Sequence, residues 1–211
     1  MLQDIQFNLA FKAEPDAKLS GPDHPWSIHL DVQSADLVAT IEGRMPRAFA
    51  WQQFAGRIAF HGEQAKHLAL LLDIDLPSTG PFDISAAMHT ADDAITLNSL
   101  KGRIKGFSGL HDIELAGGEF IIDRNALLKL ELQALIADMP LALQLETNPP
   151  SPPATEDTPR PVTAALQIAD VELDLQGTMT AVDGQPHLAF EGQLQGQNFD
   201  NLTKLLGREL P

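Results

Sequence analysis

The chain has 211 residues, an apolar fraction of 44% and a net charge of −15, with 29 acidic and 14 basic residues. It is long enough to bury a core, and its negative field opposes electrostatic binding to nucleic acid or to anionic membrane surfaces. Because it contains no cysteine, a disulfide, a thiol nucleophile and a thiolate metal site are excluded.

The first part of the chain alternates apolar and polar residues in short runs. Ile5, Phe7, Leu9 and Phe11 are each separated by one polar residue or alanine, and a period of two is typical of a strand with one apolar face. Further strands are predicted over 27–32, 37–41 and 51–60. A loop rich in proline and glycine is predicted over 14–25.

A Leu-rich helix is predicted over 63–73, because its apolar residues recur near helical spacing. It ends before Leu76 and Pro77, and the pair Gly80 and Pro81 is a turn that leads into the next strand. A second short helix is predicted over 199–206, before the final Leu210 and Pro211.

Between the two helices the alternation returns many times. A turn is predicted at Gly117 and Gly118, and Gly102, Gly106 and Gly109 indicate bulges or turns. The segment 148–161 contains six prolines and is predicted to be a loop or linker. The predicted strands cover 82–88, 95–97, 113–115, 120–122, 128–132, 141–145, 162–168, 171–175 and 188–194. The segment 100–104 either continues the strand of 95–97 or follows it as a separate strand.

The order of these features repeats. The segments around Ala35, Gly43 and Gly56 are echoed about 135 residues later, and each copy ends in a helix followed by Leu-Pro. Internal repeats define the organisation of a chain. We therefore predict two units: residues 1–77 as the end of one repeat, including helix 63–73, and residues 78–211 as the second, including the proline-rich loop 148–161 and helix 199–206. Both ends of the chain indicate a fragment of a longer protein.

The sequence thus predicts a mainly β fold in which most strands have one apolar face. Those faces could be covered by a second sheet, by closure into a barrel, or by a ligand in a curved trough. Periodicity alone does not choose among these arrangements.

Three segments resemble the C-terminal region of the AsmA family of Gram-negative envelope proteins. They are LLLDIDLPSTGPFDISAAM over 70–88, ITLNSLKGRIKGFSGLHDIEL over 95–115 and ADVELDL over 169–175, before the Leu-Pro ending. The order of these segments carries the resemblance, which extends over nearly the whole chain. The family's N-terminal membrane anchor is not in this sequence, and segment 148–161 is unusually rich in proline.

The resemblance implies an elongated, curved antiparallel sheet that forms a groove. We expect the two short helices to cap this sheet, because an open sheet end invites aggregation. The apolar stripe of the first helix could instead insert into a membrane or dock a partner. It also implies a non-enzymatic periplasmic protein, anchored to the inner membrane through parts outside this chain. Such a protein would carry phospholipid between the inner and outer membranes and support outer-membrane biogenesis. Phospholipid acyl chains would be its partners. Strand parity then predicts the groove lining: Phe7, Leu9, Phe82, Ile84, Leu130, Leu132, Leu143, Leu173 and Phe190.

The rival hypothesis is a closed β-sandwich that acts as a structural or interaction module of the envelope and binds no lipid. An enzyme would need a convergent polar cluster, and no catalytic signature is present. Ser108 does not complete a G-x-S-x-G motif, and His61 and His67 do not have the spacing of a zinc-binding H-E-x-x-H. No cofactor, metal or nucleic-acid partner is therefore predicted.

Overall fold

A computed structural model describes residues 8–15, 24–34, 36–65, 80–91, 93–107, 111–123, 128–147, 159–182 and 185–196. These residues form twelve strands and one short 3₁₀ helix, η1 (Trp51–Gln53). The strands are β1 (Asn8–Pro15), β2 (Trp26–Gln33), β3 (Leu37–Met45), β4 (Ala55–Gly62), β5 (Phe82–Ala91), β6 (Ala94–Phe107), β7 (His111–Asp123), β8 (Leu128–Ile136), β9 (Met139–Thr147), β10 (Arg160–Ile168), β11 (Val171–Val182) and β12 (Gln185–Gly196).

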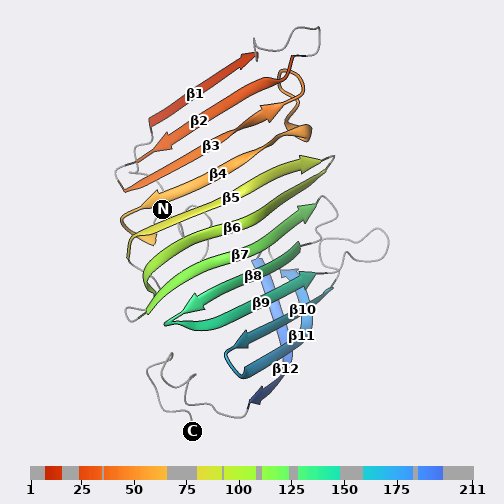
Figure 1. The fold of residues 1–211 in the computed structure, drawn as a ribbon. Coiled ribbons are helices and arrows are strands. Elements are labelled where there is room, and N and C mark those ends of the chain that lie inside the picture. Colours follow the sequence, from red (N-terminus) through yellow and green to blue (C-terminus); the bar gives the residue numbers. More distant parts are fainter. Residues whose placement is uncertain are drawn as a thin grey trace.

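All twelve strands belong to one sheet, in which each strand pairs antiparallel with its neighbours in sequence (Figure 1). The order runs from β1 to β12 without a crossover, and the sheet is open, because β1 and β12 do not pair with each other. The predicted mainly β, curved antiparallel sheet is confirmed. The closed sandwich is not the arrangement of the described strands, since they form a single sheet.

The register of the sheet separates its side chains into two faces. Side chains of directly opposed residues lie on the same face, and successive residues alternate between faces. We define the apolar face by Leu37, Ala39, Ile41, Gly43 and Met45 of β3 and by their register partners through the other strands. The opposite side of the sheet is the polar face.

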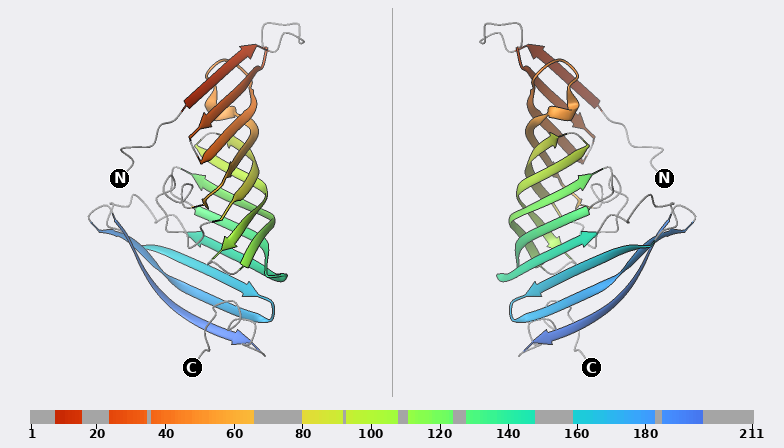
Figure 2. Two further views of the ribbon diagram at one scale, coloured as in Figure 1. Left: turned by 90° about the vertical axis from the view of Figure 1, so that its left-hand side faces the viewer. Right: turned by 90° about the vertical axis from the view of Figure 1, so that its right-hand side faces the viewer.

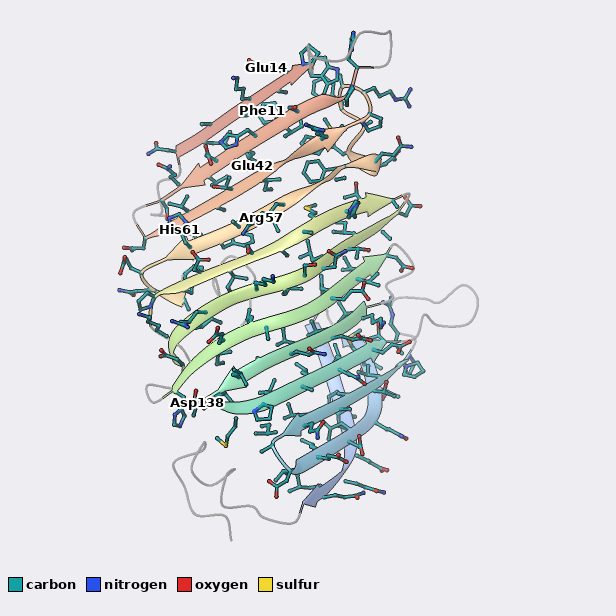
Figure 3. The ribbon with its side chains drawn as sticks, in the orientation of Figure 1. Phe11, Glu14, Glu42, Arg57, His61 and Asp138 are labelled. Carbon is teal, nitrogen blue, oxygen red and sulfur yellow. The ribbon has the colours of Figure 1, made fainter. Side chains whose placement is uncertain are left out.

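The apolar face lies on the inside of the curve. Seen edge-on, the sheet bends so that β10–β12 sweep to one side (Figure 2). In the view of Figure 1 these strands curl behind the sheet. In that orientation the labelled polar-face residues Glu42, Arg57 and His61 project in front of the ribbon (Figure 3). The concave side therefore carries the apolar side chains.

Two clusters of buried side chains pack on the apolar face. One joins Leu37, Phe82 and Ala65. The other joins Ile28, Met45 and Phe54.

Within the second cluster, the ring of Phe54 lies over two paired glycines, Gly43 and Gly56. A Cβ atom at either position would lie 2.5 Å from Phe54 Cζ. Only glycine leaves room for the ring here, so an aromatic side chain covers backbone that has no side chain of its own.

Several local predictions were wrong. The strand predicted over 51–60 begins only at Ala55, because residues 51–53 form η1. No turn occurs at Gly117 and Gly118, because β7 runs through them with a register shift between Leu115 and Gly117. Of the two alternatives for 100–104, the structure has the continuous one: 95–97 and 100–104 are one strand, β6, with a register irregularity at Ser99, a residue of positive φ.

The predicted helices fall outside the described residues, except for 63–65 of the first. The proposed boundary between residues 77 and 78 also lies there. The sheet continues across that boundary, since β4 pairs with β5 over its whole length. The division into two repeats stays a prediction.

Candidate functional site: the apolar face

Charge is almost absent from the apolar face. Every Asp, Glu, Lys and Arg of the twelve strands lies on the polar face except Arg160. Other side chains on the apolar face that have N–H or O–H groups are Trp26, Thr90, His111 and Thr147, and each of them stands near a strand end. The strand interiors thus present one uncharged surface from β1 to β12.

Two of these polar side chains are satisfied by the backbone. Thr90 Oγ1 donates to the carbonyl of Trp51 and accepts from the amide of Phe54. Thr147 is 1% exposed, and its Oγ1 accepts from the amide of Leu128 at 2.9 Å. Both hydroxyls therefore serve the fold and are not free to bind a ligand. His111 differs, because its Nε2 is buried and has no hydrogen-bond partner.

Large apolar side chains on this face remain exposed in three places. Leu9 and Phe11 are exposed on β1, with Leu9 at 67%. Phe190 and Leu194 are exposed on β12, with Leu194 at 50%. Between them, the opposed pair of Ile95 on β6 and Ile122 on β7 is also exposed. Exposed apolar side chains gathered on one face indicate a binding surface more strongly than scattered ones.

The register brings the predicted lining residues together. All of them lie on the apolar face except Phe7, which is outside the described residues. Leu130, Leu143 and Leu173 are half-buried, whereas Phe82 is only 4% exposed within its packed cluster. Phe82 can support the surface but offers little area to a ligand. The role of these residues as a lipid lining stays a prediction.

The sequence reasoning missed four exposed members of the same face: Phe11, Ile95, Ile122 and Leu194. Phe11 and Leu194 follow the same alternation as Leu9 and Phe190, so parity could have found them. Ile95 and Ile122 lie in the two strands with bulges, where parity changes part-way along the strand.

The polar face is held by ion pairs and hydrogen bonds between neighbouring strands. His29 Nε2 lies 2.6 Å from Asp31 Oδ2, and His29 Nδ1 lies 3.0 Å from Glu42 Oε1. Thr40 also donates to Asp31 Oδ1. Hydrogen bonding to His29, and secondarily to Thr40, holds the pKa of Asp31 below its ordinary value.

Lys129 forms a similar pair on β8. Its Nζ lies 2.9 Å from Glu131 and 3.7 Å from Glu119, and the bond to Glu131 raises the pKa of the amine.

The larger hollows described on the surface lie on the polar face. One of about 510 Å³ spans β8–β12, where the small residues Thr163 and Ala165 form a floor among Glu131, Glu146 and Asp174. Another of about 660 Å³ spans β5–β7 beside Lys101, Arg103 and Glu114. Arg103 is paired with Glu114 at 3.2 Å. Within the described residues no group of three or more His, Asp or Glu side chains could hold a metal ion.

No family model, no curated protein and no solved structure matches the chain. The described part of the chain also contains no helix with the length and hydropathy required to span a membrane. The candidate site therefore rests on the geometry of the sheet alone. Its chemistry is that of an apolar surface on the inside of a curve, with strand interiors that carry no charge.

Proposed function

We propose that this chain is a non-enzymatic part of a periplasmic, AsmA-like protein that carries phospholipid between the inner and outer membranes. In this role it would contribute to outer-membrane biogenesis, and the intact protein would be anchored to the inner membrane. The observation that supports the proposal is the apolar face, whose strand interiors carry no charge and which continues through the twelve described strands on the inside of an open sheet. The resemblance of 70–88, 95–115 and 169–175 to that family is the second support.

Acyl chains need such a surface for a physical reason. Each CH₂ group removed from water gains roughly 0.8 kcal/mol, and one charged side chain in the path would cancel several of these gains. Continuous strand interiors without charges let an acyl chain stay in apolar contact at each step along the sheet. Headgroups can remain in water at the open side, so transfer needs no enclosed polar pocket.

The alternative function is a structural or interaction module of the envelope that carries no lipid. The exposed apolar residues on β1 and β12 would then contact protein. A protein interface and a lipid surface share apolar chemistry. The two functions are therefore distinguished by whether phospholipid is bound to the purified protein.

The test is native mass spectrometry of the protein purified from a Gram-negative periplasm, followed by lipid extraction. We expect phospholipid to co-purify. The double variant Leu130→Asp and Leu132→Asp places two charges on the apolar face of β8 and should abolish lipid binding. Leu194→Asp, at a half-exposed position on β12, should reduce it without the same risk to folding.

A matched control exists on the same strand. Gln133→Asp and Leu135→Asp add the same two charges on the polar face of β8, where Leu135 is exposed. This variant should bind lipid as the wild type does. If wild-type protein is folded and free of lipid, the proposal fails and the interaction module is favoured. Equal loss of lipid binding in both double variants would show a folding defect. Lipid binding by Leu194→Asp is then the test: reduced binding supports the proposal, and unchanged binding contradicts it.

A further inference from the structure

Arg160 is the one charged residue that the register places on the apolar face. It opens β10 opposite Met179 of β11, and the next residues of β10 on this face are Val162, Ala164 and Leu166. It is partly exposed, and no described residue forms an ion pair or hydrogen bond with it. On the polar face, by comparison, Arg103 pairs with Glu114, and Lys129 pairs with Glu131. A free guanidinium beside an apolar surface requires an explanation.

Acidic residues stand at both ends of the strands near Arg160, including Asp123 at the end of β7 on the Arg160 side. Arg160 stands at the end where β9 finishes and β10 begins. At the opposite end, the turns that join β8 to β9 and β10 to β11 carry exposed Asp138 and Asp170. Since the whole chain has a net charge of −15, an anionic group is repelled nearly everywhere. Arg160 offers it a favourable position at one edge of the apolar face.

We propose that Arg160 binds the phosphate of a phospholipid headgroup and thereby fixes the direction in which the lipid lies on the sheet. The headgroup is held at the Arg160 end, and the acyl chains extend across the apolar face toward Ile168 and Val171, away from Arg160. This inference rests on the proposed lipid function. A guanidinium suits the role because its planar N–H groups match phosphate oxygens in pairs.

The dimensions of β10 agree with this orientation. Eight residue steps separate Arg160 from Ile168, which at ~3.3 Å per residue is about 26 Å. One leaflet contributes half of a hydrocarbon core roughly 30 Å thick, so the strand is longer than an extended acyl chain in a membrane. Along it the face presents Val162, Ala164, Leu166 and Ile168, none of which carries a charge.

The experiment compares two lipids that differ only in the headgroup. The delipidated protein is incubated with dioleoylphosphatidylcholine vesicles containing 10% dioleoylglycerol, and native mass spectrometry measures how much of each lipid is bound. We expect Arg160→Gln to lower phosphatidylcholine binding about tenfold relative to dioleoylglycerol, because the charge-assisted contact to phosphate is lost. Arg160→Lys should restore part of the preference, since the charge returns without the paired geometry.

Arg57→Gln is the matched control, because it removes the same charge from the polar face, where Arg57 donates to Ser85 Oγ at 2.9 Å. It should leave the lipid preference unchanged. An unchanged preference in Arg160→Gln, with both lipids bound, overturns the role of Arg160 and leaves lipid binding intact. Absence of both lipids from the wild type overturns the proposed function itself. If the wild type binds inorganic phosphate at Arg160 but no lipid, the inference is also overturned.

Discussion

Phe54 offers the sharpest test of how this sheet is stabilised. Its side chain is 1% exposed and packs with Ile28 and Met45 on the apolar face. The residues beneath its ring are Gly43 and Gly56, which have no side chains to move into the space that truncation would leave. Phe54→Ala should therefore lower the free energy of unfolding by about 3–5 kcal/mol, the range of Phe→Ala changes in cores that cannot collapse into the cavity.

The measurement is urea denaturation followed by far-UV circular dichroism, with Phe49→Ala as the matched control. Phe49 lies five positions earlier and is 76% exposed, so its truncation should change the free energy of unfolding by less than about 0.5 kcal/mol. A loss of several kcal/mol is a large part of the roughly 5–15 kcal/mol that stabilises a typical domain. Equal, small effects for both variants would refute the packing of Phe54 over the two glycines.

Two further predictions concern polar groups. Thr147→Val keeps the shape of a side chain that is 1% exposed but leaves the amide of Leu128 without this acceptor. It should lower the free energy of unfolding by about 1–3 kcal/mol in the same assay. An unchanged free energy of unfolding would contradict a stabilising role for this hydrogen bond. Asp31→Asn tests the network on β2 and β3. Because the pKa of Asp31 is lowered in the fold, its contribution is present above its ordinary pKa of 3.8 and is lost as the pH falls through the lower folded value. The wild type should therefore lose stability more steeply than Asp31→Asn below about pH 4, and parallel pH profiles would show that the network contributes nothing.

Strand parity predicted the composition of the apolar face well, for a reason that lies in the sequence. Leu130, Leu143 and Leu173 share a face because their strands alternate without interruption and pair in phase. The two strands with bulges behave differently. In β7 the apolar face changes from odd-numbered residues at Ile113 to even-numbered residues at Phe120, and the sequence alone presented this change of phase as a turn. An inserted residue and a turn give the same short-range pattern, and only pairing with β8 distinguishes them.

Other features depended on contacts between distant residues. Nothing near Gly43 in sequence indicates that the ring of Phe54 covers it, because the contact requires the register of β3 with β4. A second contact of this kind lies between β11 and β12. A Cβ at Gly177 would lie 2.7 Å from Phe190 Cδ1, and the two residues are directly opposed in the register.

The sequence by itself determined that this protein is built of strands with one apolar and one charged side, because alternation with a period of two is a local property of the chain. The tertiary structure decided that the strands form one open sheet, that the sheet bends toward its apolar face, and that Arg160 is the one charged residue of the described strands on that face. Strand order, curvature and the position of a single cation depend on hydrogen bonds between strands, and those are set by the whole sheet and not by any one segment.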